Sequence, residues 1–443
     1  MDWDSLPEPQ RRAMRSAIVA QCFGMLTQQM LSGGILLLYL NALGVRPSRI
    51  LLLLNLMPFL SSLLSIPLGW GADRVGIKKF GTWGNAGMFA GLSLVAGAAS
   101  LRGQFPSLSM SAILAGLVVH TFGAALFNTG WFSLLSHLVP PSMTGRYFGV
   151  LRSTWQLVAL SFFALSATAF TARTPVWIYQ CVLGLGAVAV ACRGRFYKTL
   201  PEVPVSEREA LPLTKSVKRA LALPGFAAYL AYLLLLVCVT GNGPDMLRLS
   251  AVRGVGLGDD QVLFLTVGSM SGSLLGFATA GRWVDRLGPR TLFLACHIGF
   301  AVALAFFPSR TFLHLPTLAA GLAGSFLLGL ATATLGLATT AQSFRICRGT
   351  QRTIAYALVS SVQTMGSGLS GFALAAFVAH LELGGGRNPF DLVLAGLSGF
   401  VLLQIGALGL LRRPENAVTE FVVPHPVRTG SEPAGTPSNA TAT

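Results

Sequence analysis

A small set of polar and ionisable residues lies inside stretches that are otherwise apolar, and these residues are the candidates for chemistry. Asp245 is the one carboxylate placed within such a stretch, three residues before Arg248. A carboxylate there is a functional candidate because burying it is costly, although an adjacent Arg also suits a structural ion pair. Groups of this kind can bind a polar solute or exchange a proton. The full set is Gln28, Gln29, His120, Asn128, Gln156, Asn242, Asp245, Thr332, Thr334 and Gln363.

Each of these residues also has a purely structural interpretation. Amides and hydroxyls join helices in membranes by hydrogen bonds, and a lone His is more often a packing residue than a proton relay. The stretch Gly241–Pro244 should break its helix and free backbone groups, which a bilayer tolerates only against protein or a watery cavity. No Lys or Arg is expected beside the set at mid-membrane, which favours a neutral or cationic solute over a multiply charged anion. Both interpretations stay open at each position.

The elements that position these residues follow from composition. Hydrophobic residues make up 53% of the chain and charged residues 11%, and the mean hydropathy is +0.64, which indicates an integral membrane protein. The net charge of +16 arises from basic residues between apolar runs, whereas nucleic-acid binding needs them clustered in a patch. No phosphate-binding G-x-x-x-x-G-K-S/T sequence occurs, no cysteine pair has metal-ligand spacing, and no nucleophile and base cluster. We therefore expect no cofactor, no metal and no enzyme.

The chain contains twelve apolar stretches of about 20 residues, the length that crosses about 30 Å of hydrocarbon as a helix. The predicted fold class is therefore all-α, with twelve transmembrane helices. Their approximate spans are 16–41, 49–70, 80–100, 109–135, 145–170, 175–192, 224–248, 260–281, 290–308, 315–340, 352–380 and 390–411.

The distribution of basic residues predicts the orientation. With these spans, 24 of the 32 Lys and Arg residues fall on the side that carries both termini, and basic loops stay in the cytoplasm. Both termini should therefore be cytoplasmic, in a multi-pass protein of the inner membrane. We expect four regions: a six-helix bundle at 1–192, a cytoplasmic linker at 193–223 with a short surface helix around Leu213–Leu221, a second bundle at 224–413, and a disordered tail at 414–443.

A motif repeated in the two halves supports this division. The sequence G-x-x-x-D-R-x-G runs from Gly69 to Gly76 and again from Gly281 to Gly288, 212 residues later. A second match pairs Thr144-Gly-Arg146 with Thr350-Gln-Arg352. Gly69 would permit close backbone approach, and the motif Asp would meet the positive end of a neighbouring helix. The run Gly366-x-Gly368-x-x-Gly371 lies within an apolar helix and is interpreted as close packing or a bending point.

Twelve spans in two halves, a long central linker and this motif after the second and eighth helices resemble the major facilitator superfamily of secondary transporters. The resemblance covers residues 10 to about 413 and implies two pseudo-symmetric bundles around a central cavity, with alternating access by rocking. It also implies that Asp73 faces the start of the eleventh helix near Arg352, and Asp285 the start of the fifth near Arg146. The gating set is Gly69, Asp73, Arg74, Gly76, Lys78, Lys79, Arg146, Gly281, Asp285, Arg286, Gly288, Arg290 and Arg352.

The signatures of drug antiporters and sugar porters are missing, so the resemblance is to generic bacterial members. The leading hypothesis is secondary or facilitated transport of a small polar organic solute, with a coupling proton or cation as one option. The alternative is a transport-incompetent sensor or assembly factor with the same fold. The expected partners are the lipid bilayer and a small-molecule substrate, without nucleic acid, and the expected state is a monomer.

Overall fold

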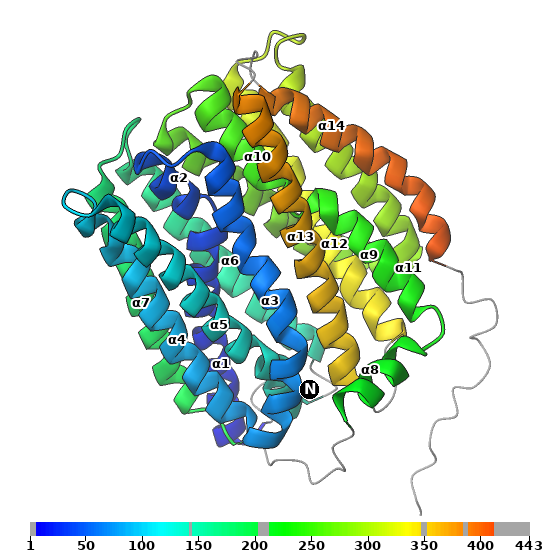
Figure 1. Cartoon of the computed structure of the whole chain (residues 1–443). Helices are drawn as coiled ribbons and strands as arrows, with labels where there is room; N and C mark the ends of the chain where they lie inside the picture. Colours follow the sequence, from blue (N-terminus) through cyan, green and yellow to red (C-terminus); the bar gives the residue numbers. More distant parts are fainter. Residues whose placement is uncertain (1–5, 141–143, 203–211, 347–351, 384–388, 412–443) are drawn as a thin grey trace, which may run out of the picture. The chain divides into compact units, whose positions relative to one another are not determined.

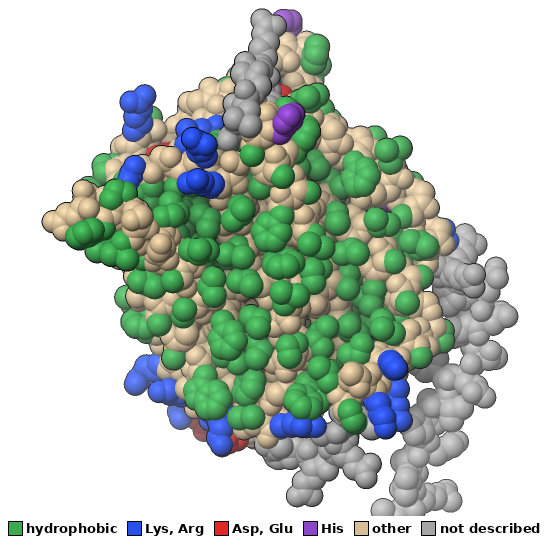
Figure 2. All heavy atoms as spheres, viewed as in Figure 1, with side chains coloured by type: hydrophobic (Ala, Val, Ile, Leu, Met, Phe, Trp, Pro, Cys, Tyr) green, Lys and Arg blue, Asp and Glu red, His purple; other side chains and the backbone are tan. Residues whose placement is uncertain are grey.

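The computed structural model describes residues 6–140, 144–202, 212–346, 352–383 and 389–411. In this part of the chain all regular secondary structure is helical. Eleven of the described helices are long and apolar enough to cross a membrane, and a bent helix pair completes a twelfth span. Figure 2 shows hydrophobic side chains across the middle of one face and Lys and Arg side chains near its two ends. The predicted fold class is confirmed.

The N-terminal half contains the first six spans. The first is the pair α1 (Glu8–Ser32) and α2 (Ile35–Ala42), bent by 42° between its two parts. The others are α3 (Pro47–Val75), α4 (Ile77–Gly97) with a 3₁₀ turn at Ala98–Leu101, α5 (Pro106–Leu138), α6 (Thr144–Ala169) and α7 (Val176–Lys198). The short helix expected around Leu213–Leu221 is confirmed as α8 (Leu213–Leu221).

The C-terminal half contains the other six spans. The seventh consists of α9 (Phe226–Thr240), α10 (Gly243–Leu249) and a π-helical turn at Ser250–Val255. The eighth and ninth run through α11 (Asp259–Ser309), whose one non-helical residue is Gly288. The remaining spans are α12 (Thr317–Ile346), α13 (Arg352–Leu383) and α14 (Pro389–Leu403), which ends in a 3₁₀ segment at Gln404–Leu410. The predicted tail at 414–443 lies outside the described residues.

Helix packing joins the halves along two seams. Within the N-terminal half α4 packs on α5 and α7, and within the C-terminal half α11 packs on α12 and α14. Between the halves α3 packs on α13, and α6 on α11; Figure 1 shows α3 and α13 side by side. The predicted close packing of the glycine run is confirmed at the first seam. A Cβ on Gly368 would lie 2.7 Å from Phe59 Cβ, and one on Gly371 would overlap the Asn55 side chain.

The repeated motif is explained in part by backbone geometry. Its last glycine has a positive φ in both halves, 109° at Gly76 and 74° at Gly288, and it ends one helix segment and starts the next. An L-residue is strained there because its Cβ crowds the backbone. The close backbone approach predicted for Gly69 stays a prediction, since no described atom lies within 4 Å of a Cβ added to that residue.

Gly76 and Gly69, at the two ends of the first copy of the motif, provide a stability test. Gly76→Ala should lower the free energy of unfolding by about 1–2 kcal/mol, the cost of a left-handed conformation. Gly69→Ala, in the interior of α3 and with no described atom within 4 Å of the added Cβ, should raise it by up to about 1 kcal/mol because Ala restricts the unfolded chain more than Gly. Thermal denaturation of the purified protein in detergent measures both. Equal melting temperatures for the two variants would contradict this account of the motif.

Candidate functional site

The first span is broken at Ser32-Gly33-Gly34. α1 ends at Ser32, Gly34 has a φ of 107°, and α2 begins at Ile35. A helix end leaves its last carbonyl groups without partners in the helix. The break therefore places free backbone acceptors inside a membrane span, where they need partners from elsewhere in the protein.

The partners of these carbonyl groups come from the C-terminal half. Arg248 Nη1 on α10 donates to the Ser32 carbonyl at 2.9 Å, and Thr266 Oγ1 on α11 donates to the Gly33 carbonyl at 2.6 Å. Arg248 Nη1 also donates to Asp245 Oδ1 at 2.9 Å, forming a salt bridge within α10. Asp245, the carboxylate singled out from the sequence, thus orients the arginine that joins the two halves. We call Asp245, Arg248, Thr266 and the Ser32–Gly34 backbone the clamp.

The seventh span is also broken, as its Gly241–Pro244 sequence predicts. α9 ends at Thr240 and α10 begins at Gly243, with Asn242 between them. Asn242 Nδ2 donates to the Ser367 carbonyl at 2.9 Å and to Ser370 Oγ at 2.8 Å, both on α13. The Asn242 side chain is buried, with 1% of its surface exposed, and it fastens the break to a neighbouring helix of its own half.

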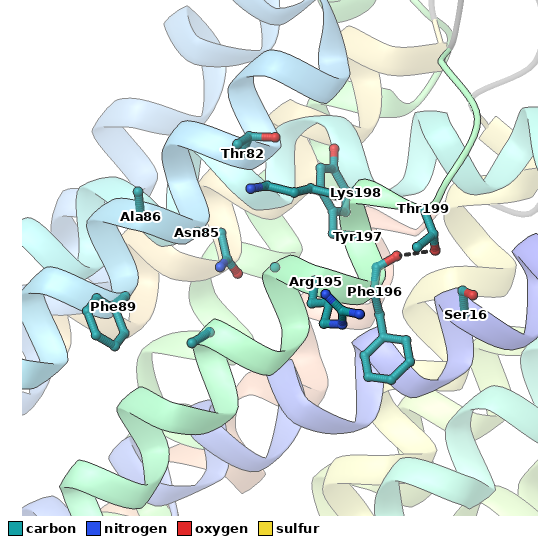
Figure 3. Close-up of a pocket in the computed structure, with 12 residues that line it drawn as sticks. Ser16, Thr82, Asn85, Ala86, Phe89, Arg195, Phe196, Tyr197, Lys198 and Thr199 are labelled. Atoms are coloured by element: carbon teal, nitrogen blue, oxygen red, sulfur yellow. Dashed lines mark hydrogen bonds between the residues drawn. The ribbon is translucent and has the colours of Figure 1, made fainter.

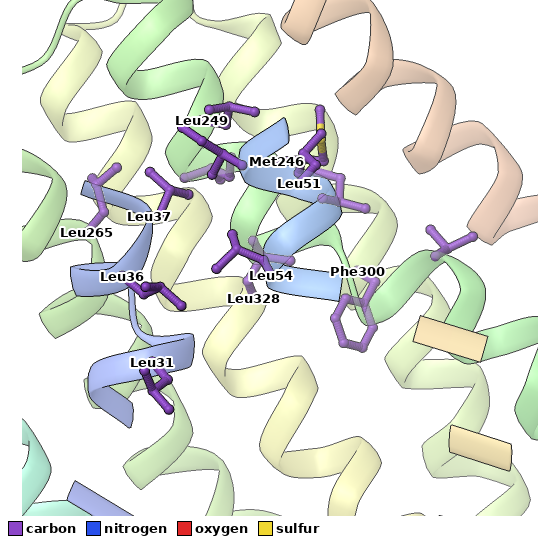
Figure 4. Close-up of a cluster of buried hydrophobic side chains, with 14 of the residues drawn as sticks. Leu31, Leu36, Leu37, Leu51, Leu54, Met246, Leu249, Leu265, Phe300 and Leu328 are labelled. Atoms are coloured by element: carbon purple, nitrogen blue, oxygen red, sulfur yellow. The ribbon is translucent and has the colours of Figure 1, made fainter. Parts of the chain in front are cut away.

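Polar contacts beyond the clamp close the same end of the protein. Arg253 Nη2 donates to the Val45 carbonyl at 3.2 Å, and the Thr174 amide donates to Asp259 Oδ2 at 2.9 Å. Each of these bonds joins the two halves. Figure 4 shows a cluster of buried apolar side chains from α1, α2, α3 and α10–α12, including Leu37, Leu249 and Leu265. The halves are thus held together at the end where α2 and α10 lie.

Gln28 and Gln29 lie one turn before the clamp on α1. The Gln28 side chain is exposed and the Gln29 side chain is half-buried. Ser32 Oγ donates to the Gln28 carbonyl at 3.0 Å. Gln28 and Ser32 lie on one face of the helix because they are four positions apart. Among the predicted site residues, these two glutamines and Asp245 belong to the region of the break.

The structure places the other predicted residues elsewhere. His120 is buried, and its Nδ1 lies 3.2 Å from the Met88 carbonyl, so it packs α5 against α4 inside the N-terminal half. Gln156 is buried in the seam between the halves, where its Nε2 donates to the Met270 carbonyl on α11 at 3.0 Å.

Thr332 and Thr334 donate to carbonyls of their own helix, Leu328 and Leu330. Asn128 is exposed on α5, and Gln363 is half-buried on α13.

The gating residues are described only in part. Lys78 Nζ donates to the Leu200 carbonyl at 2.8 Å, within its own half. The Arg74 guanidinium lies 3.6 Å from the centre of the Trp70 ring, and Lys79, Arg286 and Arg290 are exposed. The side chains of Asp73, Arg146, Asp285 and Arg352, and the surroundings of Gly281, lie outside the described residues, as do the predicted contacts between them.

The sequence did not predict that three arginines in the described part of the chain are buried. Arg310 has 7% of its surface exposed, Arg248 has 6% and Arg193 has 4%. Arg248 forms a salt bridge with Asp245, so one basic side chain lies beside the predicted polar set. Arg193 belongs to α7, which continues six residues beyond the predicted span end at 192. Its guanidinium lies 3.3 Å from the centre of the Phe127 ring and donates to Met88 Sδ at 3.6 Å. Arg193 and Tyr197 are four residues apart, which is one helical turn, and both are buried. This helical spacing is the feature of the sequence that could have extended the predicted span.

Known proteins with the same architecture match this chain. The Major Facilitator Superfamily model matches residues 17–255, more than half of the chain. No curated protein matches. Among solved structures, the nucleoside transporter NupG has a TM-score of 0.64 at 13% identity, covering 92% of this chain and 100% of its own. A POT family transporter in complex with 5-aminolevulinic acid has a TM-score of 0.69 at 11% identity, covering 90% and 97%.

The xylose transporter XylE from E. coli is a third structural neighbour, with a TM-score of 0.65 at 13% identity over 91% of this chain and 98% of that one. At these identities the similarity establishes the fold alone. The family match, the twelve spans and the neighbours together indicate a multi-pass protein of membrane transport that acts on small solutes. On the extent of the family match, the chain belongs to the Major Facilitator Superfamily.

Proposed function

We propose that the chain carries a small polar organic solute across the membrane by alternating access, with the solute bound beside the break in the first span. The observation that carries this proposal is the clamp. Two bonds, from Arg248 and Thr266, join carbonyls of one half to side chains of the other. Such bonds can form only while the halves are together at this end, so they belong to one of the two states that alternating access requires.

The break itself supports the position of the binding site. Broken helices in secondary transporters present backbone groups and helix ends to a solute near the middle of the membrane. Gln28 offers an exposed amide one turn before the break, and Gln29 and Asp245 lie near it. Solved structures of the same fold are described as transporters of nucleosides and of xylose, which supports a polar organic solute.

Counterflow in proteoliposomes tests the proposal. Vesicles loaded with single members of a panel of nucleosides, sugars, amino acids and organic cations should accumulate the matching labelled solute for at least one class. Protein-free vesicles are the control for leakage. A folded protein that gives no flux with any class would reject transport and favour the alternative of a sensor or assembly factor.

Two alanine variants separate binding from packing. Gln28→Ala should raise the KM for the transported solute about tenfold, the loss of one hydrogen bond to the solute, with an unchanged melting temperature because the Gln28 side chain is exposed. His120→Ala should lower the melting temperature through the loss of a buried contact to Met88 and leave the KM unchanged. The reverse pattern would place the site at His120 and not at the break.

A further inference from the structure

A cavity of about 780 Å³ lies inside the N-terminal half, between α1, α4 and α7. None of the residues that line it belongs to the clamp or to the predicted solute site. Figure 3 shows Lys198 extended toward Thr82 on α4, with Asn85 deeper between the helices and Arg195 nearer to Ser16 on α1. The proposed transport function leaves this cavity without a role.

The lining changes character along the membrane normal. Lys198 is the last residue of its span, and Arg195 lies one turn inside it. On α4, which begins at Ile77, Thr82 is about 7 Å and Phe89 about 18 Å from the start of the helix at 1.5 Å per residue. The cavity is therefore cationic and hydroxylated at the membrane boundary, and apolar at Ala86 and Phe89 toward the interior of the bilayer.

The polar part of the lining suits a phosphate ester. Arg195 and Lys198 are exposed cations, and none of the described lining residues is acidic. Asn85 is 8% exposed and donates its amide to the Val190 carbonyl at 2.9 Å, which leaves its Oδ1 without a hydrogen-bond partner among the described residues. Two cations can bind a phosphate, whereas Asn85 is too deeply buried to contribute to that contact.

We propose that this cavity binds the headgroup of an anionic phospholipid. Arg195 and Lys198 hold the phosphate, and an acyl chain lies against Ala86 and Phe89. Basic pockets between membrane helices commonly bind lipid headgroups in this way. A free phosphate would use the same cations but would gain nothing from the apolar part of the lining. The change from polar to apolar lining along the cavity therefore favours the lipid.

Lipid titrations of the purified full chain in a neutral detergent test this site, with native mass spectrometry as the measure of bound lipid. Dioleoylphosphatidylglycerol should bind more tightly than dioleoylphosphatidylcholine. Arg195→Gln/Lys198→Gln should weaken phosphatidylglycerol binding roughly 30-fold, because each cation near the membrane surface contributes about fivefold. Ala86→Trp, which fills the apolar part and keeps both cations, should weaken it as well.

The matched control is Arg12→Gln/Lys218→Gln, which removes two exposed cations from α1 and α8 and should change binding less than threefold. An equal loss in the control would mean that only the general surface charge attracts the lipid, which overturns the site. Full binding by Ala86→Trp would exclude the cavity. Inorganic phosphate that displaces phosphatidylglycerol at equal concentration would indicate a site for free phosphate and overturn the assignment to lipid.

Discussion

Replacing Arg248 with Gln should release the α2/α10 end of the protein and destabilise its fold. The guanidinium makes one bond across the halves, to the Ser32 carbonyl, and one within α10, to Asp245. Loss of the charged bond across the halves should shift the population toward an open end by roughly 10- to 150-fold, since such bonds contribute about 1.5–3 kcal/mol. Loss of the pair should cost about 3 kcal/mol of stability, the lower end for buried pairs, because the Asp245 side chain keeps 21% exposure.

Two measurements separate these effects. In sealed vesicles, a cysteine at Gln28, in a chain freed of its six native cysteines, reports closure through its labelling by a membrane-impermeant maleimide added only on the side of the α2/α10 end. Gln28 is exposed in this structure, so protection here means protection from that side alone. The melting temperature reports the ion pair. Asp245→Asn/Arg248→Gln should recover much of the lost stability, because neither charge is then buried alone, but should stay as open as the single variant. A double variant that regains closure would show that Asp245 and not the Ser32 carbonyl holds this end.

The fold could be predicted because its signals are local and repeated. An apolar run long enough to cross the bilayer identifies each span wherever it lies in the chain, and α8 and the break at Gly241–Pro244 follow from residues next to each other. The glycines that pack on α3 also follow from short spacing within α13. Such local features can be predicted because the residues that determine them are close together in the sequence.

The clamp could not be predicted because its parts are distant in sequence. In the sequence, Ser32-Gly33-Gly34 is a run of small residues without a visible partner. Arg248, which donates to the Ser32 carbonyl, lies 216 residues later. His120 shows the same limit in reverse, since its identity suggests chemistry and only its position against Met88 assigns it to packing. The sequence predicts that Arg193 begins the linker, because a charge normally ends an apolar run. The rings around it make its burial tolerable, and they are invisible from its neighbours in sequence.

Gly34→Ala should open the same end by steric means. Gly34 has a φ of 107°, a conformation that costs an L-residue roughly 1–2 kcal/mol. The added Cβ would lie 3.2 Å from Arg248 Cδ and 3.5 Å from Thr266 Oγ1. The contact to Thr266 is an ordinary one, but the Arg248 side chain would have to move by a few tenths of an ångström. Labelling of the cysteine at Gln28 should therefore rise toward the level in Arg248→Gln, together with a lower melting temperature.

Gly44→Ala is the matched control, because Gly44 lies just beyond the other end of α2 and has a φ of 66°. Its Cβ would meet one side-chain atom, Arg102 Nη2 at 3.5 Å, and no part of the clamp. The backbone strain is thus the same in kind, and the loss of stability should be similar, while the cysteine at Gln28 stays protected. If Gly44→Ala exposes that cysteine as much as Gly34→Ala does, strain in α2 opens this end by itself and the contact between Gly34 and Arg248 is not what keeps it closed.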